Sequence, residues 1–128
     1  MDETFDEREK LLRAVWPPTK KPNFWQNGRL SSAALKDKNG LSVERTYDRT
    51  VSDAVSVMIQ RLQGLIVSIT VSDCHAVQAC IKYKPTKANP YHSEIHGSES
   101  EIMLSDVQAL LLARSAVLQY DPNGEYKV

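Results

Sequence analysis

The residues best suited to chemistry gather in the segment 89–97, which reads Asn-Pro-Tyr-His-Ser-Glu-Ile-His-Gly. It contains two of the three histidines, His92 and His96, with one carboxylate, Glu94, between them. Side chains of an extended strand alternate between its two faces, so these three would project from the same face. A histidine near its unperturbed pKa of about 6.5 can transfer a proton or contact a phosphate. The segment therefore predicts a catalytic His92 oriented by Glu94, with His96 as a binding residue.

A metal site is an alternative interpretation of the same row. In a straight strand the span from His92 to His96 is about 13 Å, which is too long for one tetrahedral ion. Further ligands would have to come from Cys74, His75 and Cys80, the remaining soft side chains. Both cysteines precede the row, whereas the zinc deaminase signature requires them after it. We therefore expect no metal and no tightly bound cofactor.

Groups that could hold an anion follow the turn pair Asn-Gly at positions 27–28. Arg29 supplies a guanidinium and Ser32 a hydroxyl, and Lys36 and Arg45 add positive charge. The sequence has no glycine-rich phosphate-binding motif of the P-loop or dinucleotide type. Together with the histidine row, these residues predict, as one alternative, a small enzyme acting on a phosphorylated or nucleotide substrate. The other interpretation is a solvated turn and strand without a ligand.

Nucleic-acid binding is a further alternative. Lys82, Lys84 and Lys87 lie beside Tyr83 and Tyr91, and such a segment can contact a phosphate backbone and stack on bases. Lysines also protect the edge strand of a sheet from aggregation. The whole chain has sixteen basic and sixteen acidic residues and a formal charge of zero, so this function would require a local basic patch.

The lack of a strong catalytic motif favours a small accessory or protein-interaction domain as the leading hypothesis. Its partner would be another protein or a second copy of the chain. Phe24, Trp25 and Trp16 would be natural anchors for a partner if they were exposed, and a small additional core if they were not.

Targeting signals are absent from the beginning of the sequence, which is acidic and of mixed charge. No apolar run approaches the roughly 20 residues that span a bilayer, so we expect no membrane contact. Cys74 and Cys80 do not form a disulfide framework. These features lead us to expect a cytoplasmic protein of prokaryotic type.

Periodicity, capping residues and turn residues predict the elements along the chain. Thr50 can cap one helix, and Ser105 with Gln108 has the spacing of a capping box. The predicted elements are a helix at 2–16 ended by Pro17 and Pro18, a hairpin of 32–36 with 41–45, a helix at 50–64, paired strands at 65–72 and 77–83, a short strand at 91–97, and a helix at 105–120.

A chain of 128 residues is close to the commonest domain size, so we expect one domain over residues 1–128. The predicted fold is a small α+β domain with a mainly antiparallel sheet and an N-terminal, a central and a C-terminal helix packed on one side. Residues 121–128 are expected to form a turn and a loose tail. The buried face of the last helix is predicted to consist of Val107, Leu110, Leu111, Val117 and Leu118.

Overall fold

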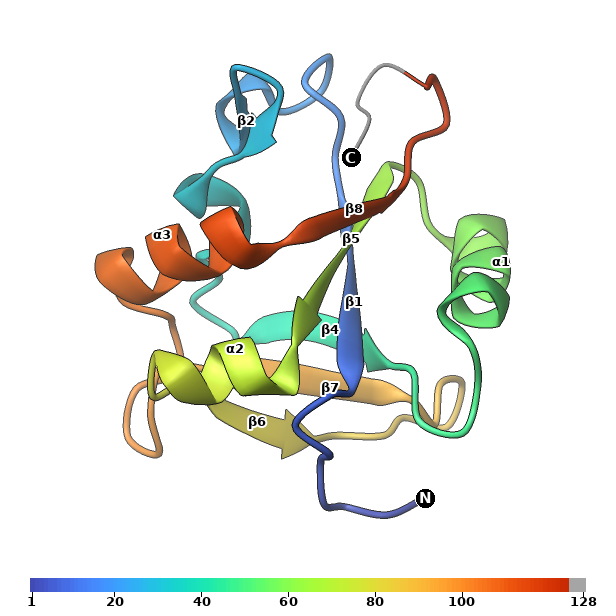
Figure 1. Ribbon diagram of the computed structural model, residues 1–128, viewed down its shortest axis with the longest axis vertical. Coiled ribbons are helices and arrows are strands. Elements are labelled where there is room, and N and C mark those ends of the chain that lie inside the picture. The colour runs from blue at the N-terminus through green and yellow to red at the C-terminus, as the bar shows by residue number, and fades with distance from the viewer. Residues whose placement is uncertain (125–128) are drawn as a thin grey trace.

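A six-stranded antiparallel sheet with the strand order β6-β7-β4-β1-β5-β8 forms the centre of the computed structural model, which describes residues 1–124 (Figure 1). Its strands are β1 (Lys10–Val15), β4 (Leu41–Arg45), β5 (Leu65–Thr70), β6 (Cys80–Tyr83), β7 (His92–His96) and β8 (Val117–Tyr120). The helices are α1 (Val51–Arg61), α2 (Val71–Ala76) and α3 (Asp106–Ser115), with short 3-10 helices η1 (Pro22–Phe24) and η2 (Ser32–Leu35). The α+β class and the mainly antiparallel sheet are confirmed.

Helices cover both faces of the sheet. Successive residues of a strand point to opposite faces, so neighbouring residues of β1 show which helix lies on each side. Leu11 of β1 packs in the largest cluster, to which α2 and α3 contribute, whereas Leu12 packs with Ala54 and Met58 of α1. Figure 1 shows α1 on one side of the sheet and the other two helices on the opposite side. The prediction that all helices pack on one side is therefore wrong.

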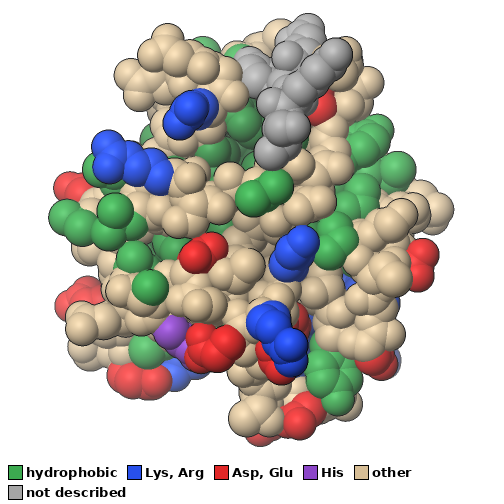
Figure 2. All heavy atoms as spheres, viewed as in Figure 1, with side chains coloured by type: hydrophobic (Ala, Val, Ile, Leu, Met, Phe, Trp, Pro, Cys, Tyr) green, Lys and Arg blue, Asp and Glu red, His purple; other side chains and the backbone are tan. Residues whose placement is uncertain are grey.

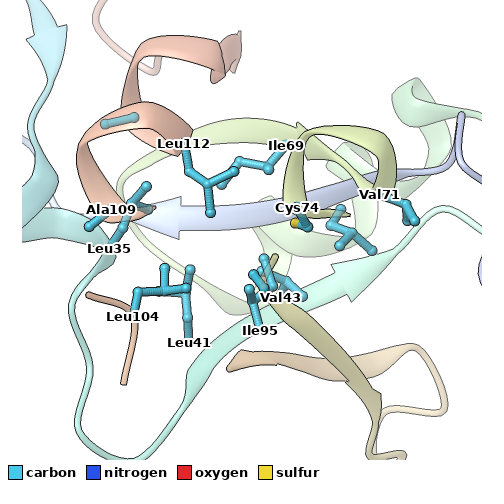
Figure 3. Packing of buried hydrophobic residues seen from close by; sticks show 13 residues of the cluster. Leu35, Leu41, Val43, Ile69, Val71, Cys74, Ile95, Leu104, Ala109 and Leu112 are labelled. Carbon is cyan, nitrogen blue, oxygen red and sulfur yellow. The ribbon is translucent and has the colours of Figure 1, made fainter. Parts of the chain in front are cut away.

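The largest hydrophobic cluster joins the sheet to α2 and α3. Figure 3 shows Leu112 and Ala109 of α3 and Cys74 of α2 directed toward Val43 and Ile95 of the sheet. All five side chains are buried. This packing sets the position of α3 against the strands.

The segment expected to form an N-terminal helix contains the strand β1 instead. Leu11 and Leu12 are both fully buried, although they are adjacent, because β1 lies between β4 and β5 and both of its faces are covered. Phe5 precedes the strand and packs against the largest cluster. A central strand with two buried faces has a nearly continuous apolar run, and that run also satisfied the helical spacing.

The predicted hairpin of residues 32–36 and 41–45 is also wrong. The first half forms η2, whose Ala34 and Leu35 are buried, and this short helix packs against α3. The second half is β4, which pairs with β1 and β7. A two-residue hairpin does occur upstream, where β2 (Trp25–Gln26) pairs with β3 (Arg29–Leu30) around Asn27 and Gly28, both with positive φ.

The helix predicted after Thr50 is confirmed as α1. Thr50 caps it, because its side-chain oxygen accepts a hydrogen bond from the backbone nitrogen of Asp53 at 3.0 Å. The helix ends at Arg61, shortly before Gly64, which has a φ of +111°. At Gly64 an added Cβ would lie 2.4 Å from the carbonyl oxygen of Val15, so the close approach of α1's end to β1 requires glycine.

The strands predicted at 65–72 and 77–83 exist as β5 and β6, but they do not pair with each other. The strands β1, β4 and β7 lie between them, and β6 forms one edge of the sheet. The short connection expected between them includes the helix α2, capped by the side chain of Thr70. That helix turns the chain away from β5 and toward the opposite edge. The short strand predicted at 91–97 is confirmed as β7.

The capping box of the last helix is confirmed, because Ser105 and Gln108 exchange both side-chain to backbone hydrogen bonds. The helix α3 ends at Ser115, earlier than predicted, and the chain continues as the edge strand β8 beside β5. The turn at Asp121 is present, with its carbonyl accepting from the nitrogen of Gly124 at 3.2 Å. The last part of the predicted loose tail, residues 125–128, lies outside the described residues. No helix in the described part of the chain is long and apolar enough to cross a membrane.

Candidate functional site

The histidine row lies on β7 as the strand alternation predicts. Ser93 and Ile95 are fully buried, whereas His92, Glu94 and His96 are partly exposed on the other face of the strand. This is the face of the sheet opposite the cluster under α2 and α3, because Ile95 belongs to that cluster.

Contacts within the row differ from the proposed pairing. Glu94 Oε1 lies 2.8 Å from Nε2 of His96 and 3.3 Å from Nζ of Lys84. Burial alone would raise the pKa of Glu94, but the hydrogen bonds from His96 and Lys84 outweigh it and hold this pKa below its ordinary value. His92 instead has Nδ1 2.8 Å from the carbonyl oxygen of Lys84 and Nε2 3.3 Å from Oγ of Ser42. Glu94 therefore orients His96 rather than His92.

Arg45, one of the proposed binding residues, is fully buried and already paired. Its guanidinium donates from Nε and NH2 to the two carboxylate oxygens of Glu9, each at 2.8 Å, and also to carbonyl oxygens of the N-terminal segment. The rings of Phe5, Tyr47 and Tyr83 lie 4.0, 4.9 and 5.3 Å from its central carbon. These contacts give Arg45 a structural role, which is to hold the N-terminal segment against the sheet.

The other proposed anion-binding residues lie away from the histidine row. Arg29 is exposed on β3, and Ser32 begins η2. Lys36 forms an ion pair with Asp106 at the start of α3. Both η2 and β3 contact α3, which covers the face of the sheet opposite His92. The fold does not bring these groups and the row together.

A cluster around Glu44 was missed from the sequence. Glu44 is only 5% exposed, and its carboxylate accepts from Arg49 at 3.3 Å, from Arg61, and from the side-chain amide of Asn89 at 2.9 Å. The guanidinium of Arg49 also lies over the ring of Tyr91, with its central carbon 3.6 Å from the ring centre. Glu44 and its three partners come from three separate segments of the chain, 44–49, α1 and the segment before β7. No local spacing in the sequence could therefore indicate this cluster.

Beside this cluster, the strands β1 and β4 separate and leave a cleft. Their pairing is limited to two positions, and the last is Leu12 with Glu44. A cavity of about 240 Å³ lies there, and Arg13, Arg61 and His92 are among its lining residues. A sequence signal for it did exist, since Arg13 is a charged residue inside an otherwise apolar segment of a central strand.

The outward face of α3 is the other distinctive surface. Val107, Leu110 and Leu111 are exposed by 66, 41 and 40%, and Ile102 and Met103 just before the helix are exposed by 50 and 42%. We call these five residues the α3 face. Figure 2 shows hydrophobic side chains gathered at the left edge of the molecule, over α3. Three of the five were predicted to be buried, and that prediction is wrong.

The inner side of the same helix explains the error. Ala109, Leu112 and Ala113 are the residues of α3 that pack into the sheet cluster. Of the other residues predicted to be buried there, Val117 is exposed and Leu118 is half-buried, and both lie on β8. The helix is apolar on both sides, so its pattern does not indicate which side faces the sheet.

The aromatic residues proposed as anchors mostly serve the core. Trp25 is 8% exposed and packs in a second cluster with Val15, and its Nε1 donates to the carbonyl oxygen of Trp16 at 2.7 Å. Phe24 packs on the same cluster, while Trp16 itself is 39% exposed under the ammonium of Lys20.

Neither cysteine has the character of a reactive thiol. Burial raises the pKa of Cys74 to about 12, and burial together with a hydrogen bond to Glu99 raises the pKa of Cys80. Within residues 1–124, no group of three or more His, Cys, Asp or Glu side chains is arranged to hold a metal ion.

Comparison of the chain with protein-family models, with curated proteins and with solved structures found no significant match. The functional argument therefore depends on the geometry of the residues themselves.

Proposed function

We propose that this protein is an interaction domain that self-associates through the α3 face. The observation that carries the proposal is a helix with apolar side chains on both sides, of which only one side is covered. A helix that is apolar all round is normally buried all round. Contiguous exposed apolar patches on soluble domains usually mark binding surfaces.

The charges at the two ends of α3 suit a second copy of the same helix. Asp106 lies four residues before Leu110 and Arg114 lies four residues after it. If two copies pack antiparallel around a two-fold axis near Leu110, Asp106 of each copy lies opposite Arg114 of the other. A two-fold interface requires such self-complementarity. Lys36 already contacts Asp106 and holds this carboxylate at the edge of the patch.

The alternatives considered from the sequence have less support in the contacts. A His92–Glu94 catalytic pair is not formed, because Glu94 contacts a different histidine and both ring nitrogens of His92 have partners. Two of the three lysines considered for nucleic-acid binding are paired with carboxylates, Lys82 with Glu99 and Lys84 with Glu94, and Lys87 is exposed. Lys82 also lies on the edge strand β6, where a lysine prevents unwanted strand pairing.

Sedimentation equilibrium over a wide dilution range tests the proposal. The parent should dissociate from dimer to monomer on dilution, and Leu111→Glu should shift this equilibrium by at least about tenfold, because a charge would be buried at the centre of the patch. Val57→Glu is the matched control, since Val57 is 46% exposed on α1, across the sheet from α3. A monomeric parent at every concentration, or equal effects of the two substitutions, would refute self-association through α3.

Charge reversal then tests the antiparallel arrangement. Arg114→Glu alone should weaken the dimer, because the new carboxylate would oppose Asp106 of the other copy. Combining Arg114→Glu with Asp106→Lys should recover part of the loss. If the single and the double variant dissociate equally, the two helices do not pack in this register.

A further inference from the structure

Arg13 has an unusual position for a charged residue. It belongs to the central strand β1, and the Nε atom of its guanidinium is buried with no hydrogen-bond partner among residues 1–124. Its NH1 donates to the carbonyl oxygen of Ser42 on β4 at 3.0 Å, across the opening between the two strands. Because a buried N–H group without a partner is costly, this position calls for an acceptor.

The surroundings of Arg13 carry an excess of positive charge. Arg49 and Arg61 share one carboxylate, that of Glu44. Arg13 and Arg61 line the same cavity, and Asp37 is the acid whose charge acts on Arg13, so three guanidinium groups are balanced by two carboxylates. Asp37 acts on Arg13 only as a charge and forms no ion pair with it in the described part of the chain. The side chain of Arg13 is partly buried, and this burial lowers the pKa of its guanidinium. An added anion would offset both the charge excess and the lost solvation.

The cleft also has room and an apolar wall. Ala14 and Leu62 line the cavity of about 240 Å³ from its apolar side, and a neighbouring cavity of about 440 Å³ shares them, together with Arg13 and Arg61. Small-molecule sites combine such apolar surface with a few polar groups that fix orientation. The lining residues of the two cavities do not include the five residues of the α3 face, so the cleft is separate from that face.

We propose that this cleft binds a small molecule with an apolar body and a phosphate or carboxylate group. The oxyanion accepts hydrogen bonds from Nε of Arg13 and from the guanidinium of Arg61, and the apolar body contacts the side of the cavity formed by Ala14 and Leu62. His92 lies at the same cavity, held by Ser42, and limits the size of the ligand. This site is independent of the proposed self-association.

The test uses phenyl phosphate and benzoate as probes and follows the arginine Nε–Hε signals by nitrogen–proton NMR. The Nε–Hε signal of Arg13 should shift in a saturable way with at least one of the two probes. Tighter binding of phenyl phosphate would indicate a phosphate ligand, and tighter binding of benzoate a carboxylate ligand. Inorganic phosphate should bind at least about tenfold more weakly than phenyl phosphate if the apolar wall contributes. Chloride at equal ionic strength is the control for salt effects.

Two variants relate binding to the cleft. Arg13→Gln and Arg61→Gln should each weaken binding of the better probe by about tenfold or more. Arg8→Gln should leave it unchanged, because the Arg8 side chain is 92% exposed and lies outside the cleft. Unshifted backbone signals on other strands show whether each variant remains folded. The proposal is overturned if neither organic probe moves the Arg13 signal, if chloride moves it equally, or if a folded Arg61→Gln variant binds like the parent.

Discussion

The substitution Glu9→Gln tests whether the buried ion pair with Arg45 anchors the N-terminal segment. The side chains of Arg45 and Glu9 are 0 and 6% exposed, and two parallel hydrogen bonds of 2.8 Å join them. Removing one charge of a buried pair typically costs about 3–5 kcal/mol, because the other charge remains buried without compensation. A domain of this kind has a total free energy of unfolding of about 5–15 kcal/mol. The substitution should therefore remove a large part of the stability.

Urea unfolding at neutral pH, followed by circular dichroism, measures this loss. With a slope of about 2 kcal/mol per molar urea, the midpoint should fall by about 2 M. Glu7→Gln is the matched control: Glu7 is two residues away, and its side chain is 60% exposed and pairs with His75 at the surface, where an ion pair contributes about 0–1 kcal/mol. The reasoning is refuted if Glu9→Gln costs less than about 1 kcal/mol or no more than this control.

Three further predictions concern single positions. Glu94→Gln should lower the free energy of unfolding by about 1 kcal/mol at pH 7, because the hydrogen bonds to the carboxylate are weakened. The pKa of Glu94 is lowered in the folded state, so the difference in stability between variant and parent should be complete above the ordinary pKa of 4.5. It should decrease below 4.5 and vanish once the pH falls below the lowered pKa of the folded state. Urea titrations at several pH values measure this, and a pH-independent difference would contradict it. Gly64→Ala should cost about 1–3 kcal/mol, since its Cβ would lie 2.4 Å from the carbonyl oxygen of Val15; an unchanged melting temperature would contradict the geometry. In the native protein iodoacetamide should modify Cys80 slowly and leave Cys74 unmodified until unfolding, because Cys74 is fully buried and its pKa is about 12; mass spectrometry showing equal modification would contradict this.

Features with a local cause were predictable from the sequence. Thr50 and Ser105 cap their helices with side-chain hydrogen bonds that span three residues, and such spacing is visible in the chain itself. The alternation of buried and exposed residues around His92 likewise depends only on the geometry of one strand. For the same reason the row at 92–96 could be placed on one face of β7 without knowing its neighbours.

The candidate sites required the tertiary structure. Arg45 was a plausible ligand-binding residue until the fold placed Glu9, which is 36 positions away, against its guanidinium. Arg13, Arg61 and His92 meet only because β1 and β4 separate beside the end of α1. Contacts of this kind join segments far apart in the chain, and no spacing rule connects them.

The α+β class, the two capped helices and four of the six strands of the large sheet follow from the sequence alone, because hydrophobic period and capping act over a few residues. Three features depend on the packing of the whole chain: residues 10–15 form a central strand, three strands lie between β5 and β6, and the outward side of α3 remains exposed. A run of apolar residues predicts that apolar surface will be buried, but it does not predict which element will cover that surface. The choice depends on the packing of the whole chain, where a strand with two covered faces and a helix with two apolar sides have similar local patterns.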